Sequence, residues 1–205
     1  MGKLIVTEFM TLDGVAQAPG GPEEDRDGAF VHGGWQAPVS DPESGGVMFE
    51  QARTMDALLL GRRTYEIFAE YWPTAPDEIP FTALLNAAPK YVASRTLTEP
   101  LEWHGSTLLE GDVAESVAAV KERHDEVHLI GSLDLLQSLL NAGLVDRFDL
   151  WVYPVLLGRG KKVFAGGTVP TTLRLTESVT YPRGALQLSY EPVGVPTYGN
   201  VADGD

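Results

Sequence analysis

The sequence predicts a three-layer α/β fold, in which helices cover both faces of a mostly parallel mixed sheet and a hairpin adds antiparallel strands near the C-terminus. Two observations carry this prediction. Short apolar runs that end in glycine or a polar residue alternate along the chain with segments of helical periodicity. Near the end, two alternating segments flank Pro182-Arg183-Gly184, which is typical of a hairpin turn.

Each expected strand is a short apolar or alternating run bounded by turn residues. We expect strands at Lys3–Phe9, Ala57–Leu60, Lys90–Ser94, Ser106–Leu109, Val127–Ile130, Phe148–Val155, Leu173–Tyr181 and Ala185–Val193. Because single strands and helices alternate through most of the chain, the first strands are expected to pair in parallel.

The expected helices begin at recognisable start signals. Asp41 caps a helix over Glu43–Thr54, with proline in the first turn. Arg62–Tyr71 follows the second strand, and its apolar side chains fall on one side. A short helical piece ends at Ala87, Asp112 caps the next helix, and Leu133–Asn141 is the last.

A long polar stretch, Thr11–His32, is rich in glycine, proline and acidic residues, which is typical of a lid or binding loop. Within it, Glu23, Glu24 and Asp25 are expected to form a solvated loop. No linker divides the chain, so we expect one domain over residues 1–195 and a flexible tail over 196–205.

Composition excludes several functional classes. The 205 residues carry 29 acidic and 15 basic side chains, a formal net charge of -14, which disfavours nucleic acid and anionic membranes as partners. The chain has no cysteine, and its four histidines lack metal-ligand spacing, so no metal site is predicted. No apolar run suits a signal peptide or a membrane span, so we expect a cytoplasmic protein.

Three strand ends carry residues suited to phosphate groups. In the first, Gly61 allows a tight turn, Arg62 or Arg63 can pair with a phosphate, and Thr64 adds a hydroxyl at a helix start. Each feature is also common in plain turns. Their repetition at several strand ends favours a dinucleotide.

The second strand end, Ser94-Arg95-Thr96, suits a phosphate monoester such as the one that distinguishes NADP from NAD. The third, Gly131-Ser132, leads into a helix and offers another phosphate-sized backbone pocket. Since the chain contains neither Gly-x-Gly-x-x-Gly nor a Walker loop, it is not a standard Rossmann or P-loop protein.

These motifs carry a resemblance to a known family. The matching segments are Phe9–Ala16, Leu60–Glu66, Ser94–Thr96, Ile130–Ser132 and Gly143–Phe164. Together they resemble the dihydrofolate reductase-like superfamily, most closely the branch of the RibD C-terminal domain, the reductase domain of bacterial riboflavin biosynthesis. The resemblance covers about residues 3–193 and implies a dihydrofolate-reductase-like three-layer sandwich.

The resemblance also implies NADPH as cofactor, lying across the strand ends. It implies cofactor-binding residues at Gly61, Arg62, Arg63, Thr64, Ser94, Arg95, Gly131 and Ser132. Of these, Gly61, Arg62 and Thr64 would hold the pyrophosphate. Ser94 and Arg95 would bind the 2′-phosphate and adenosine side, and Gly131 and Ser132 would approach the central phosphates and the nicotinamide ribose. The family often has a second glycine where this chain has Ser132.

The catalytic group is less evident. Folate reductases place a carboxylate on the first helix, but the corresponding position falls near Gly45, where no acid lies, which argues against folate. Asp13 is the catalytic candidate, and the Asp-Gly pair is also a common turn. His32, Trp35 and Tyr153 are the candidates for substrate binding.

The predicted function is NADPH-dependent reduction of a small heterocyclic, imine or carbonyl substrate. Two alternatives remain: a non-catalytic nucleotide- or pterin-binding module of the same fold, which the missing helix acid would fit, and a reductase that uses a flavin. The resemblance also implies a homodimer, for which the apolar segment Phe148–Leu157 could supply a covered strand edge.

Overall fold

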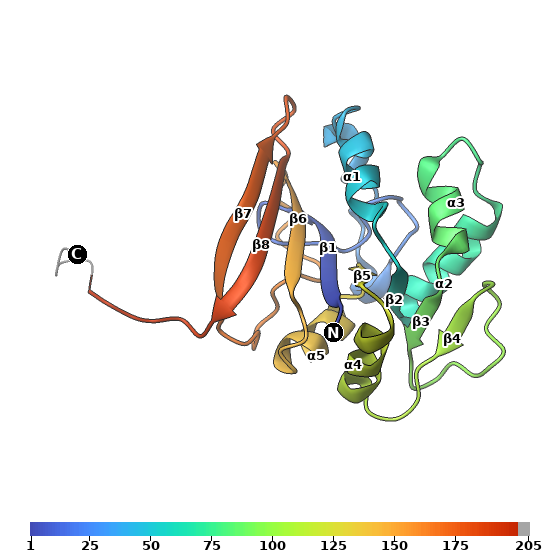
Figure 1. Cartoon of the computed structure of the whole chain (residues 1–205). Coiled ribbons are helices and arrows are strands. Elements are labelled where there is room, and N and C mark those ends of the chain that lie inside the picture. The colour runs from blue at the N-terminus through green and yellow to red at the C-terminus, as the bar shows by residue number, and fades with distance from the viewer. Residues whose placement is uncertain (201–205) are drawn as a thin grey trace.

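The computed structural model describes residues 1–200 and contains an eight-stranded mixed sheet (Figure 1). The strand order is β4-β3-β2-β5-β1-β6-β8-β7. Pairs from β4 to β6 are parallel, and the two pairs that involve β8 are antiparallel. The strands are β1 (Lys3–Thr11), β2 (Ala57–Gly61), β3 (Lys90–Ala93), β4 (Ser106–Leu108), β5 (Glu126–Ile130), β6 (Arg147–Tyr153), β7 (Thr172–Thr180) and β8 (Leu186–Gly194).

Helices pack on both faces of this sheet. In β2, Leu59 joins the cluster on the α4–α5 side, while Leu58 and Leu60 join the cluster on the α2–α3 side. This explains why the strand is an uninterrupted apolar run. The helices are α1 (Ser44–Ala52), α2 (Arg62–Tyr71), α3 (Pro80–Ala87), α4 (Val113–Arg123) and α5 (Leu133–Asn141), with short 3-10 turns at Asp27–Ala29, Ala37–Val39 and Trp72–Thr74. The predicted α/β sandwich with its antiparallel hairpin is confirmed.

One helix cap differs from the prediction. Asp112 caps α4 as expected, because its carboxylate accepts hydrogen bonds from the amides of Ala114 and Glu115. Asp41 does not cap α1. Its buried carboxylate accepts from the amide of Arg183 at 3.2 Å, so it ties the start of α1 to the turn of the β7–β8 hairpin.

The segment Phe148–Leu157 is not a sheet edge, so the expectation that it supplies a dimer edge is wrong. Its strand, β6, lies between β1 and β8, and its backbone is paired on both sides. Trp151 and Tyr153 within it are fully buried. The sheet edges in the described residues are β4 and β7.

None of the helices within residues 1–200 is both long and apolar enough to span a membrane.

The inner strand β1 buries an acid that the sequence did not single out. Glu8 is 2% exposed, and its Oε1 atom has no hydrogen-bond partner. Burial raises the pKa of Glu8 to about 8, so its carboxyl is mainly neutral at pH 7. The carbonyl of the preceding residue, Thr7, accepts a hydrogen bond from the amide of Gly131, so Glu8 directly follows a residue that contacts one of the predicted phosphate turns.

Glu8 should therefore make stability depend on pH. Its carboxyl has a pKa near 4.5 in the unfolded chain and about 8 in the folded protein. Because the folded state keeps this proton at higher pH, the contribution of Glu8 to the free energy of unfolding falls as pH rises from 4.5 to 8. We expect Glu8→Gln, which keeps the shape but cannot ionise, to be more stable than wild type at pH 8, by at most about 4–5 kcal/mol. The gain should fall to below about 1 kcal/mol at pH 5.

Urea unfolding of both proteins at the two pH values measures the difference. Glu50→Gln, at an exposed position on α1, is the control and should show no such pH-dependent gain. A difference between Glu8→Gln and wild type that is the same at both pH values would contradict the titration of Glu8.

Candidate functional site

Two of the predicted phosphate turns meet at the carboxyl edge of the sheet. Strands β2 and β5 are neighbours, and each runs directly into a helix, α2 after Gly61 and α5 after Ser132. The amide of Gly61 donates a hydrogen bond to the hydroxyl of Ser132 at 2.8 Å. A Cβ atom on Gly61 would lie 3.3 Å from the Cβ and Oγ atoms of Ser132, so glycine suits this close approach.

The β5–α5 turn has a backbone conformation that normally favours glycine. Gly131 has a φ of +65° and Ser132 a φ of +63°, both in the left-handed region. For serine this conformation costs about 1–2 kcal/mol, part of which its hydrogen bond with Gly61 offsets. A Cβ on Gly131 would lie 3.5 Å from the side chain of Thr64, so four predicted residues are brought together here.

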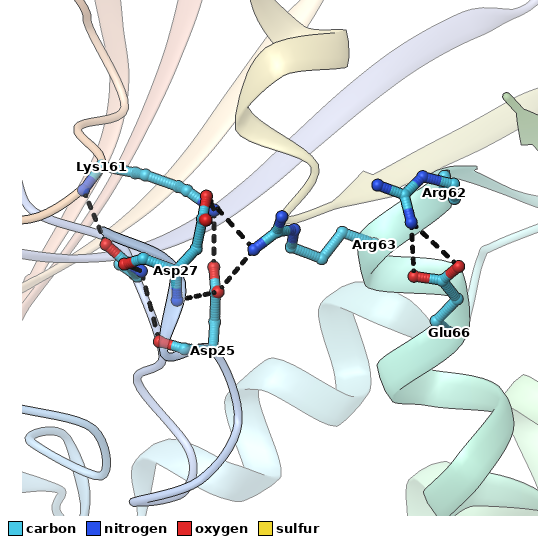
Figure 2. Close-up of polar contacts among 7 residues, drawn as sticks. Asp25, Asp27, Arg62, Arg63, Glu66 and Lys161 are labelled. Atoms are coloured by element: carbon cyan, nitrogen blue, oxygen red, sulfur yellow. Dashed lines mark hydrogen bonds and ion pairs between the residues drawn. The ribbon is translucent and has the colours of Figure 1, made fainter. Parts of the chain in front are cut away.

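The two arginines after Gly61 are already paired. Arg62 Nη1 donates to both carboxylate oxygens of Glu66 at 3.0 Å, one turn along α2. Arg63 points the other way, toward the loop that follows β1, and its Nη1 lies 2.9 Å from an oxygen of Asp25 (Figure 2). Both guanidinium groups are partly exposed, and a ligand would have to exchange with these carboxylates to reach them.

A lysine that the sequence analysis missed completes this cluster. Lys161 Nζ lies 2.8 Å from Asp25 and 3.0 Å from Asp27, and Arg63 contacts the same two acids (Figure 2). Lys161 lies on the loop between β6 and β7, about a hundred residues from Arg63 in sequence. The basic stretch Arg159–Lys162 after a strand was the signal available for it, but nothing in the pattern indicated its partners.

The expectation that the acidic loop is merely solvated is wrong for Asp25. Its side chain is 11% exposed and is held by Arg63 and Lys161. Although burial alone would raise the pKa of Asp25, the hydrogen bonds from Lys161, Asp27 and Arg63 lower it overall. Glu24 also has a local role, since its carboxylate accepts from the amides of Gly20 and Gly21. The loop is therefore an ordered part of the site.

Ser94 and Arg95 follow β3, the strand next to β2, and Ala93 is the register partner of Gly61. The Ser94 hydroxyl accepts hydrogen bonds from the amides of Thr96 and Leu97, which closes the turn. Arg95 is exposed and forms no ion pair with any part of the chain that the structure describes. Its guanidinium is therefore available beside the Gly61 turn.

Asp13 is held in a loop junction. Its carboxylate accepts hydrogen bonds from the Thr11 hydroxyl at 2.6 Å and from the amides of Leu157 and Gly158 at 3.2 and 2.8 Å. These hydrogen bonds, that of Thr11 foremost, lower the pKa of Asp13 to about 2. An ionised carboxylate has no proton to donate at neutral pH, so the geometry favours the turn role over proton donation.

The three candidate substrate residues are placed differently. Trp35 and Tyr153 are buried and meet edge to face at 5.7 Å. Their polar atoms form hydrogen bonds within the protein: Trp35 Nε1 donates to the backbone carbonyl of Gln17, and the Tyr153 hydroxyl accepts from the side-chain nitrogen of Gln36. His32 is exposed and lines an open groove of about 900 Å³ between residues 27–32 and residues 157–161. The structure thus separates His32 from the buried pair.

The model of the RibD C-terminal domain family matches residues 2–187, and the chain belongs to this family. It is similar to the uncharacterized protein YyaP of Bacillus subtilis (strain 168), with 27% identity over 192 residues, which cover 92% of this chain and 94% of YyaP.

Solved structures agree on the fold. A putative riboflavin biosynthesis protein from Shewanella sp. PV-4 superposes with a TM-score of 0.71 at 21% identity, covering 93% of this chain and 99% of that one. A diaminohydroxyphosphoribosylaminopyrimidine deaminase/5-amino-6-(5-phosphoribosylamino)uracil reductase from Thermotoga maritima gives a TM-score of 0.60 at 14% identity, covering 94% of this chain and 57% of that one. The protein has the dihydrofolate-reductase-like fold of these RibD-related chains.

If Asp13 holds the two loops together, its charge should matter for stability. We expect Asp13→Asn to lower the free energy of unfolding by about 1–2 kcal/mol at pH 7, because one backbone amide loses a charged acceptor. The depressed pKa means that this contribution is present above about pH 4 and is lost as pH falls toward 2. Denaturant unfolding at pH 7 and pH 2.5 measures it, and equal stability at pH 7 would contradict the structural role.

Proposed function

We propose that this chain is an NADPH-dependent reductase of a small heterocyclic, imine or carbonyl substrate. The observation that carries the proposal is the contact between the β2–α2 and β5–α5 turns, together with Arg95 in the turn after the neighbouring strand β3, which forms no ion pair within residues 1–200. Parallel α/β sheets bind ligands at this edge, and backbone amides with arginine suit the phosphates of a dinucleotide.

The donor set fits such a cofactor. The Cβ positions of Gly61 and Gly131 face the side chains of Ser132 and Thr64, so two hydroxyls lie where the two turns meet. Arg63 and Lys161 each bind carboxylate oxygens of the acidic loop. Carboxylate and phosphate oxygens accept hydrogen bonds from such cations in a similar way. When bound, NADPH would supply the hydride, and the protein would orient the substrate and exclude water.

Two features support a substrate other than folate. Among the residues of α1, the single acid is Glu50, which is exposed and paired with Arg53. The inner positions of this helix therefore offer no carboxylate to a pterin. The names of the related structures, a riboflavin biosynthesis protein and an aminouracil reductase, favour a nitrogen heterocycle.

A second candidate is a nucleotide- or pterin-binding module without turnover. The observation that favours it is the state of Asp13, whose engaged and ionised carboxylate leaves the expected proton donor unidentified. NADPH oxidation in the presence of a panel of heterocycles distinguishes the two functions, since a binding module would bind NADPH without consuming it. The homodimer stays a prediction that light scattering of the purified protein can test.

Calorimetric titration with NADPH and NADH tests the cofactor. We expect selective binding of NADPH, and we expect Arg95→Ala to weaken it by about 1.5–3 kcal/mol, the usual contribution of hydrogen bonds to charged groups. NADH, which lacks the 2′-phosphate, should respond little to the same change.

Arg53→Ala is a matched control, because Arg53 is also exposed but lies at the far end of α1. It should leave NADPH affinity unchanged. If wild-type protein binds neither nucleotide, the reductase proposal fails.

A further inference from the structure

The acidic loop after β1 forms a closed set of ion pairs with the cations of the candidate site. Arg63 lies 2.9 Å from Asp25 and 3.2 Å from Asp27, and Lys161 lies 2.8 and 3.0 Å from the same two residues. Each cation therefore contacts both acids, as Figure 2 shows. Three segments that are distant in sequence meet here: the loop after β1, the start of α2 and the loop between β6 and β7.

The side chain of Gln17 also holds this loop in place through hydrogen bonds. Its amide nitrogen donates to the carbonyl oxygens of Asp25 and Asp27 at 3.2 and 3.0 Å, and its carbonyl oxygen accepts from the amide of Lys161 at 3.1 Å. The Gln17 side chain that makes these hydrogen bonds is itself buried, at 4% exposed. The carboxylates of Asp25 and Asp27 are thereby held against the cations by backbone as well as by charge.

The position of this cluster connects it to the proposed cofactor site. Arg63 is the second residue of α2, two positions after Gly61, and so belongs to the turn proposed for the pyrophosphate. Two adjacent carboxylates present to Arg63 and Lys161 the same kind of paired, negatively charged oxygens that a pyrophosphate would present. In a protein with a formal net charge of -14, cations left unpaired here would also attract other acidic segments.

We propose that Asp25 and Asp27 are an internal substitute for the phosphates of the cofactor, and that NADPH binding exchanges them for its own phosphates. This inference rests on the proposed function. In it, Lys161 joins Arg63 as a cofactor ligand, and the segment from Gly20 to Ala29 moves away from α2 when the nucleotide binds.

The exchange has a measurable consequence. As long as the carboxylates occupy Arg63 and Lys161, a nucleotide binds only the fraction of molecules in which the loop has opened, so its apparent affinity is lowered by that fraction. Removing the two negative charges should therefore tighten binding. If the acids instead helped to build the site, their removal would weaken it.

The first test is calorimetric titration of NADPH into wild type and into the double variant Asp25→Asn with Asp27→Asn. We expect the variant to bind about ten-fold more tightly. The control is Glu23→Gln with Glu50→Gln, which removes the same charge at residues whose ion pairs within residues 1–200 are with Arg26 and Arg53. Its affinity should equal that of wild type. Unchanged or weaker binding by the Asp25 and Asp27 variant would overturn the exchange.

The second test concerns Lys161. Lys161→Met should weaken NADPH binding in the Asp25 and Asp27 variant, where the lysine is free to reach the phosphates. Lys162→Met is the matched control, because this neighbouring lysine is exposed and forms no ion pair within residues 1–200. Equal affinities for the two methionine variants would show that Lys161 does not bind the nucleotide.

A third measurement separates this inference from the proposed function. Hydrogen exchange of peptides that cover residues 20–30 should be faster in the double aspartate variant than in wild type. It should also rise in wild type when inorganic pyrophosphate is added. If neither protein bound NADPH, the cofactor proposal would fail, and this measurement would still decide whether anions release the loop. Unchanged exchange in both comparisons would refute the release.

Discussion

The hydrogen bond between the amide of Gly61 and the hydroxyl of Ser132 joins the two strand-to-helix turns on which the candidate site depends. It requires β2 and β5 to be adjacent and parallel, so that both strands deliver their helices to the same edge of the sheet. It also requires a residue without a side chain at Gly61 and a left-handed backbone at Ser132. The Thr64 side chain lies beside Gly131 at this contact, and Arg95 follows the next strand, β3.

Charge is the second constraint on the site. An acidic protein that binds an anionic ligand needs local cations, and here Arg63 and Lys161 are supplied together with Asp25 and Asp27, which neutralise them. The arrangement stabilises the loop after β1 against α2. It also means that the affinity of the site for anions depends on the position of one loop, and not only on the number of basic residues.

The candidate site could be predicted in part because strand ends carry recognisable residues. Gly61, Thr64, Gly131 and Ser132 lie together, as their places at the ends of parallel strands indicated. The pairing of Arg63 and Lys161 with Asp25 could not be predicted, since it joins side chains from one helix and two loops whose approach depends on the packed sheet. The same reason applies to Glu8, where strand alternation does not reveal whether a polar side chain finds a partner in the core.

The sequence by itself determined the class of fold, because the periodicity of apolar residues and the turn residues between them depend only on residues that are close together in the sequence. It also determined the alternation of strands and helices and the terminal hairpin. Only the tertiary structure decided that β6 is an inner strand, that the carboxylate of Asp13 binds the loop after β6, and that the acidic loop neutralises the cations of the site. These are contacts between distant segments, and their energies depend on burial and distance, which a sequence pattern does not contain.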